Sequence, residues 1–132
     1  MTAIVVDSSA IIAILHNEPE RERFIAVIFA ASARMMSAVS LQEVSMVHAG
    51  RLAGDDDWTR LDALLTELGI EIVAHDTALA HRARDAFLRF GKGRHPARLN
   101  FGDCASYALA RAQNLPLLFK GNDFTQTDIH AA

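Results

Sequence analysis

The sequence of 132 residues contains a single cysteine, Cys104, and one each of tryptophan and tyrosine. One cysteine cannot form an internal disulfide, and this usage is typical of a reducing cytoplasm. The apolar stretches, such as residues 24–33, are shorter than the ~20 residues that cross a bilayer. The N-terminus also lacks the basic, apolar and small-residue pattern of a secretory signal. These absences predict a cytoplasmic protein with no membrane segment.

Several catalytic motifs are missing too. The turn Ser8-Ser9-Ala10 has no glycine to admit a phosphate group, which argues against dinucleotide and P-loop binding. The run Asp7-Ser8-Ser9 lacks the second aspartate of phosphoaspartyl phosphatases. The six histidines form no pair at metal-ligand spacing, so zinc is not expected. No serine lies in the strand-turn-helix motif of a nucleophilic hydrolase.

The composition favours one compact domain over residues 1–132. Hydrophobic residues make up 51% of the chain, which is enough for a substantial core at this length. No repeat, linker or low-complexity segment interrupts it. We therefore expect a single domain.

Charge is unevenly distributed. The net charge is −3, but six of the 13 basic residues fall between Arg82 and Arg98, where Asp85 is the only acid. A local basic patch is compatible with contact to a phosphate backbone. The alternative is a solvated helix face followed by a polar loop.

Hydrophobic patterns predict alternating strands and helices. Short apolar runs predict strands at residues 3–6, 35–38, 70–74 and 116–120, and helical spacing predicts helices at residues 8–15, 20–32, 40–52, 55–68, 77–90 and 101–113. The strands lack a polar face, which is typical of a parallel sheet covered by helices on both sides. Ser40 and Glu43 fit a capping box, and Asp76 and Asn100 fit helix N-caps.

Four acidic residues occupy places where a solvated charge is not expected: Asp7, Glu43, Asp103 and Asp123. Asp7 ends an apolar strand, Asp123 follows the last strand, and the other two lie near helix starts. In open α/β sheets the site lies beyond the carboxyl ends of the strands. Carboxylates gathered there require protons or a cation, and oxygen ligands favour Mg²⁺ or Mn²⁺. The pattern predicts metal-dependent phosphate chemistry.

Each of these acids also has a structural explanation. Glu43 fits the partner of a Ser40 cap, and an acid at Asp103 favours the helix dipole behind an Asn100 cap. Asp7 fits a helix cap, and Asp123 fits a turn residue. Four acids with purely structural roles are not expected to meet at one sheet edge. We therefore favour a shared site.

With these residues in place, the chain closely resembles the PIN-domain ribonucleases, specifically the VapC-type toxins of bacterial type II toxin–antitoxin pairs. The matching segments are residues 4–10, 40–43, 91–97, 99–104 and 117–124. The resemblance implies a Rossmann-like α/β/α sandwich with a short, mostly parallel central sheet. It also implies an endoribonuclease that depends on Mg²⁺ or Mn²⁺ and leaves a 5′-phosphate and a 3′-hydroxyl.

The resemblance assigns roles to individual residues. Asp7, Glu43 and Asp103 match the family's acidic positions, with Asp7 and Asp103 expected to hold the metal, and Ser9 matches a small polar position beside Asp7. Where many relatives carry the fourth acid, this chain has Asn122, which we expect to support the site. We favour Asp123 as the fourth acid, with Asp128 as the alternative.

Partners follow from the same resemblance. Lys92, Arg94 and His95 are expected to hold the RNA backbone. A cognate antitoxin is expected to cover the acidic site, and the chain is expected to form a homodimer. Two other functions stay open, namely a catalytically silent PIN-like module that binds RNA or a protein, and a nuclease of the same fold that cuts DNA.

Overall fold

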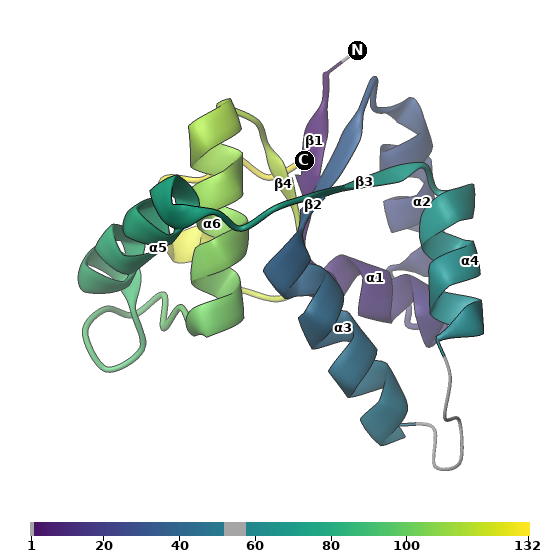
Figure 1. The fold of residues 1–132 in the computed structure, drawn as a ribbon, viewed down its shortest axis with the longest axis horizontal. Helices are drawn as coiled ribbons and strands as arrows, with labels where there is room; N and C mark the ends of the chain where they lie inside the picture. Colours follow the sequence, from purple (N-terminus) through teal and green to yellow (C-terminus); the bar gives the residue numbers. More distant parts are fainter. Residues whose placement is uncertain (1, 52–57) are drawn as a thin grey trace.

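A computed structural model describes residues 2–51 and 58–132 of the chain. Its centre is a four-stranded sheet in the order β3-β2-β1-β4, with every pair of neighbours parallel (Figure 1). The strands are β1 (Ile4–Val6), β2 (Arg34–Ser37), β3 (Ile70–Val73) and β4 (Leu117–Leu118). The predicted parallel sheet is confirmed, although β4 is shorter than residues 116–120.

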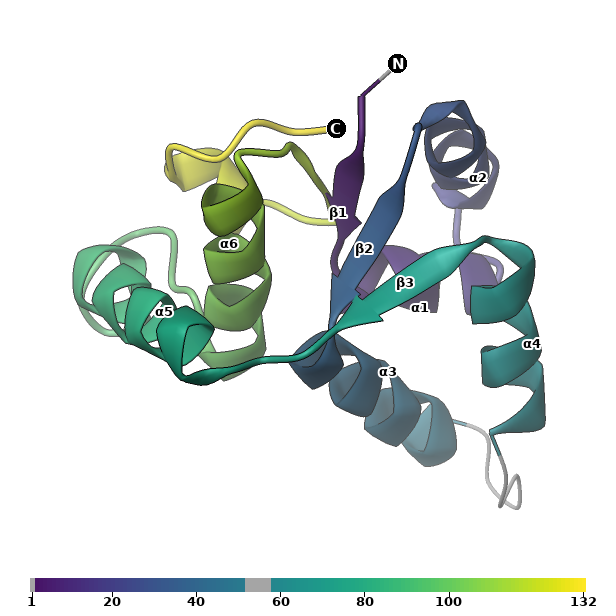
Figure 2. The same ribbon diagram turned by 45° about the horizontal axis from the view of Figure 1, so that its top comes forward.

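Helices cover both faces of this sheet (Figures 1 and 2). The helices are α1 (Ser8–Leu15), α2 (Arg21–Ala30), α3 (Ala38–Arg51), α4 (Thr59–Glu67), α5 (Thr77–Phe90) and α6 (Phe101–Gln113). Helices α5 and α6 lie on one side and α1 to α4 on the other. The end of the helix predicted at residues 40–52 and the start of the one at 55–68 fall outside the described residues. None of the described helices is long and apolar enough to cross a membrane.

The strand β1 divides the core in two. Ile4 and Val6 pack in the cluster built with α1 to α4, whereas Val5 packs in the cluster built with α5 and α6. All three side chains are buried, at 4% exposure or less. Because both faces of the sheet are covered, the strand is apolar throughout and shows no polar alternation.

The helix starts follow local capping chemistry in most places. Asp7, Asp76 and Asn100 each cap a helix with a side-chain oxygen, as predicted. The capping box predicted for Ser40 and Glu43 is wrong. Strand β2 passes directly into α3 at Ala38, so the cap comes from the last strand residue, and Ser37 Oγ accepts a hydrogen bond from the Val39 amide at 3.1 Å.

The C-terminal segment adds a contact that the sequence patterns did not predict. The Leu117 amide donates to the His130 carbonyl at 2.9 Å, and the Ala132 amide donates to the Leu117 carbonyl at 2.9 Å. The chain end thus covers the free edge of β4, which satisfies backbone groups that a bare edge strand would expose.

Candidate active site

The four predicted acids lie at the edge of the sheet where the parallel strands end. Asp7 follows β1, and Asp123 follows β4 at the start of a short 3-10 helix, η1 (Phe124–Gln126). Glu43 lies in the second turn of α3, and Asp103 in the first turn of α6. Helices α3 and α6 contact each other, and their first turns lie near the ends of β1 and β2 (Figure 1).

Asp7 is held at the centre of this arrangement by hydrogen bonds alone. The residue is only 2% exposed. Its Oδ1 accepts from Ser106 Oγ at 2.5 Å, and its Oδ2 accepts from the amide and the hydroxyl of Ser9 at 3.0 and 2.6 Å. Ser106 Oγ lies 3.0 Å from Ser40 Oγ. Among the described residues no lysine or arginine pairs with Asp7, so neutral donors fix its orientation and leave its charge uncompensated.

Glu43 points back toward the start of α1. The Ser8 hydroxyl donates a hydrogen bond to Glu43 Oε1. Burial raises the pKa of Glu43, the charge of Asp7 raises it further, and the bond from Ser8 acts against both. A Cβ atom on Gly102 would lie 2.4 Å from Glu43 Oε2, so the carboxylate occupies the space that a side chain there would fill.

Asp103 completes the capping box at the start of α6 and interacts electrostatically with the other three acids. Its Oδ2 accepts from the Asn100 amide at 3.1 Å, and its own amide donates to Asn100 Oδ1 at 2.9 Å, which completes a capping box. Burial, followed by the charges of Asp7, Asp123 and Glu43, raises the pKa of Asp103 to about 7, and the bond from Asn100 opposes the rise. The four acids therefore form one electrostatic group.

The structure separates the two candidates for the fourth acid. Asp123 is exposed and contributes to the raised pKa of Asp103. Asp128 instead accepts from the Tyr107 hydroxyl at 2.5 Å and pairs with Arg89 and Arg111 at 3.5 and 4.0 Å. Burial acts to raise the pKa of Asp128, but these three partners lower it overall. Asp123 lies beside the cluster, whereas Asp128 braces the surface of α5 and α6.

The two residues expected to support the site differ in what they contact. The Ser9 hydroxyl donates a hydrogen bond to Asp7 and accepts one from the Lys120 amide at 3.0 Å. This second bond connects the segment after β4 to the cluster. The bonds shown for Asn122 come from its carbonyl, which accepts from the amide and hydroxyl of Thr125 at 3.2 and 2.6 Å. Asn122 thus shapes the turn that carries Asp123.

Sequence reasoning did not identify the groups that orient these acids, namely Ser8 and Gly102 beside Glu43 and Ser106 beside Asp7, and it assigned Ser40 only to a helix cap. Ser106 lies three residues after Asp103 in an alanine-rich helix, and a small polar residue among alanines was the available signal. Its bond to Asp7 spans 99 positions in the sequence. No local pattern reports a contact of that separation.

The loop between α5 and α6 brings part of the predicted basic patch to the site. Lys92, Arg98 and Asn100 line a cavity of about 240 Å³ together with Asp123. Arg94 is exposed on the same loop. His95 is partly buried, because its Nδ1 accepts from the Ala97 amide at 3.0 Å and its ring lies edge-on to Phe90. His95 therefore helps to shape the loop.

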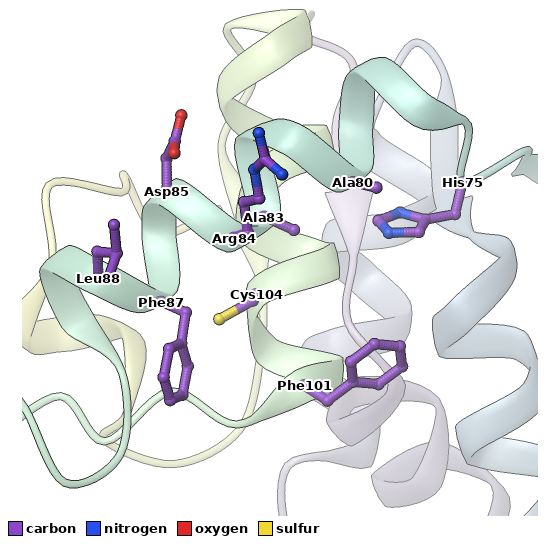
Figure 3. Close-up of a pocket in the computed structure, with 9 residues that line it drawn as sticks. All are labelled: His75, Ala80, Ala83, Arg84, Asp85, Phe87, Leu88, Phe101 and Cys104. Carbon is purple, nitrogen blue, oxygen red and sulfur yellow. The ribbon is translucent and has the colours of Figure 1, made fainter.

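A second, apolar groove of about 560 Å³ lies between α5 and the start of α6. Figure 3 shows Phe87 on α5 and Phe101 on α6 along it, with Cys104 behind. Phe101 is 77% exposed, and Cys104 is buried. None of the four acids lines this groove, so the groove and the acidic cluster are separate features of α6.

The donor set fits a hard divalent cation by its chemistry. All four predicted ligands are carboxylates, which suit Mg²⁺ or Mn²⁺ rather than zinc. Within residues 2–51 and 58–132, no three His, Cys, Asp or Glu side chains are already arranged to hold one ion. Burial and, after it, the charges of neighbouring carboxylates raise the pKa values of Glu43 and Asp103, and a cation would offset these charges.

Comparison with known proteins identifies the family of the chain. The PIN domain family matches residues 4–129. Ribonuclease VapC30 of Mycobacterium tuberculosis is 44% identical over 126 residues, which cover 96% of this chain and 95% of that protein.

Solved structures show the same fold. The M. tuberculosis toxin VapC20, described as cleaving the sarcin-ricin loop, superposes with a TM-score of 0.75 at 18% identity and covers 98% of both chains. A chain of a toxin–antitoxin complex from Klebsiella pneumoniae gives a TM-score of 0.68 at 17% identity, over 95% of this chain and 92% of that one. The chain belongs to the PIN-domain family and, within it, to the VapC ribonucleases.

Proposed function

We propose that residues 1–132 form a single PIN domain that cuts RNA internally with the help of Mg²⁺ or Mn²⁺, as the toxin of a toxin–antitoxin pair. The observation that carries the proposal is the group formed by Asp7, Glu43, Asp103 and Asp123 at the carboxyl edge of the sheet, in which the pKa of Asp103 rises to about 7. A carboxylate cluster whose members raise one another's pKa is typical of functional sites. The relationship to VapC ribonucleases supports RNA as the substrate.

In this proposal Asp7 and Asp103 hold the cation, and Glu43 and Asp123 complete its surroundings directly or through water. A bound Mg²⁺ or Mn²⁺ lowers the pKa of a water and offsets charge on the phosphate oxygens. The protein's own contribution is orientation. Ser9 and Ser106 fix both oxygens of Asp7, and Asn100 fixes one oxygen of Asp103. Hydrolysis leaves a 5′-phosphate and a 3′-hydroxyl.

Lys92 and Arg94 are proposed to hold the RNA backbone, with His95 shaping the loop that carries them and adding a further contact. Phosphate contacts of this kind position the strand but do not select a sequence. The nearness of Lys92 to Asp123 supports this role.

The proposed partners are an antitoxin and a second copy of the chain, in the cytoplasm. An antitoxin that covers the acidic cluster, with an arginine among the carboxylates, would silence the enzyme, and the fold shared with a chain of a toxin–antitoxin complex supports it. The homodimer rests on the family resemblance. Light scattering of the purified chain measures its mass in solution.

Cleavage of matched RNA and DNA oligonucleotides tests the function. The wild type should cut RNA when Mg²⁺ or Mn²⁺ is present and stop when a chelator is added. Cleavage of DNA alone would favour the DNA-directed alternative, and binding without cleavage would favour the silent module. Sequencing the 5′ ends of RNA after induced expression then gives both the activity and the target.

A further inference from the structure

The basic loop between α5 and α6 is closed firmly at its base. The Lys92 amide donates to the Leu99 carbonyl at 2.9 Å, and the Leu99 amide donates to the Phe90 carbonyl at 3.0 Å. Leu99 is fully buried, and Ala97 is 1% exposed. The loop is therefore anchored in the core. Lys92 and Arg98 are its first and last basic residues, and both lie beside these backbone hydrogen bonds.

Arg98 has an unusual backbone for its residue type. Its φ of 57° lies in the left-handed region, which glycine adopts without steric penalty and a long side chain does not favour. The other two described residues of this kind, apart from glycines, are Asn17 and Asn114, and asparagine tolerates the conformation better. Glycine would adopt this backbone more easily than arginine. We therefore infer that the side chain of Arg98 has a function.

The surroundings of Arg98 indicate that use. Arg98, Lys92 and Asn100 line the cavity that also contains Asp123, at the border of the acidic cluster. Within the described ranges, neither Arg98 nor Lys92 forms an ion pair, whereas Arg89, Arg111 and Lys120 are all engaged with acids. In the part of the chain that the structure describes, two cations without an ion pair therefore line the same cavity as the Asp123 carboxylate.

We propose that Arg98 and Lys92 form a subsite for an RNA phosphate adjacent to the one that reacts at the acidic cluster, with Asn100 as a further polar contact. The subsite rests on the proposed ribonuclease function. The planar guanidinium of Arg98 can donate two parallel hydrogen bonds to phosphate oxygens, which the ammonium group of a lysine cannot. The two positive charges offset the repulsion that a polyanion meets on approaching the four acids.

The test uses RNA binding in a cleavage-inactive Asp7→Asn background at constant Mg²⁺, so that binding is measured without turnover. The probe is a labelled single-stranded RNA of mixed sequence, and affinity is measured across a salt series. Arg98→Gly should weaken binding several-fold and reduce the salt slope by about 0.7, the value for one lost phosphate contact on a single strand. Arg98→Lys should recover most of the slope and only part of the affinity.

Arg60→Ala is the matched control, because it removes the same charge from an exposed position on α4, on the other face of the sheet. It should leave affinity and slope nearly unchanged. Thermal unfolding gives the second measurement. Arg98→Gly should unfold at the same or a higher temperature, because glycine relieves the left-handed backbone.

The outcomes for the subsite and for the ribonuclease are distinguishable. An unchanged salt slope in Arg98→Gly, or an equal loss in Arg60→Ala, overturns the subsite even if the wild type cuts RNA. A wild type that binds RNA through Arg98 but never cuts it overturns the enzyme and keeps the subsite. No RNA binding by the parent protein overturns both.

Discussion

The carboxylate of Glu43 lies directly against the backbone of Gly102, so that a Cβ atom on Gly102 would stand 2.4 Å from Glu43 Oε2. Helix α6 can approach α3 this closely because residue 102 has no side chain. The glycine therefore decides where the Glu43 carboxylate rests relative to Asp7 and Asp103.

Gly102→Ala should displace the Glu43 carboxylate and lower RNA cleavage about tenfold or more, since small misplacements of catalytic groups carry large rate penalties. Stability should change by less than about 1 kcal/mol, because the helix preference of alanine offsets the loss of the bond from Ser8 to the displaced carboxylate. Cleavage rates and thermal unfolding measure the two effects.

Gly50→Ala is the control for this substitution. Gly50 lies within α3, and nothing stands within 4 Å of a Cβ built there. It should gain stability without losing cleavage. In a Glu43→Asp background the shorter carboxylate should make Gly102→Ala less harmful. Wild-type cleavage in Gly102→Ala would show that the close contact does not matter.

Asp7→Asn and Asp103→Asn should each abolish cleavage while leaving the fold intact. An amide keeps the shape of the side chain and can still accept the hydrogen bonds from Ser9 or Asn100, but it weakens cation binding. Wild-type protein should gain about 2.7 kcal/mol of stability when Mg²⁺ is present at a hundred times its dissociation constant. Both variants should gain much less over the same Mg²⁺ series. Retained cleavage in both variants would remove the metal site.

The pKa of Asp103 predicts how the metal-free protein responds to pH. The carboxyl has a pKa of about 7 in the fold and an ordinary value of 3.8. Between these values the unfolded chain has released a proton that the fold still binds, so this group's contribution to stability is complete below about pH 4 and is lost as the pH rises through 7.

Asp103→Asn has no such proton to lose. Its stability relative to the wild type should therefore increase from pH 4 to pH 8, by about 1–3 kcal/mol after allowance for solvent screening. Chemical denaturation in a chelating buffer measures the difference. A stability difference between Asp103→Asn and the wild type that stays constant from pH 4 to pH 8 would contradict the raised pKa.

Metal titrations of Asp123→Asn and Asp128→Asn decide the fourth acid. Asp123→Asn should reduce cleavage strongly and raise the Mg²⁺ concentration needed for activity, because Asp123 acts on Asp103. Asp128→Asn should leave the Mg²⁺ requirement unchanged and lower stability by about 0.5–1 kcal/mol, because the pairs with Arg89 and Arg111 are lost. A larger activity loss at Asp128 would move the fourth ligand there.

The sequence by itself predicted most of the local structure and singled out the candidate residues of the site. Apolar runs without a polar face predicted a parallel sheet, and Asp7, Asp76 and Asn100 predicted the starts of three helices. These signals act over a few residues, through capping bonds and side-chain periodicity. The capping box predicted for Ser40 and Glu43 was wrong, because β2 passes into α3 without a loop. A local motif does not indicate how many residues separate a strand from the next helix.

Only the tertiary structure decided how the acids are held and charged. Ser8 lies 35 positions from its partner Glu43, and Ser106 lies 99 positions from Asp7. The pKa of Asp103 depends on burial and on carboxylates contributed by three other segments of the chain. Burial and charge interactions act through space, so they arise only when folding brings distant segments to the same edge of the sheet.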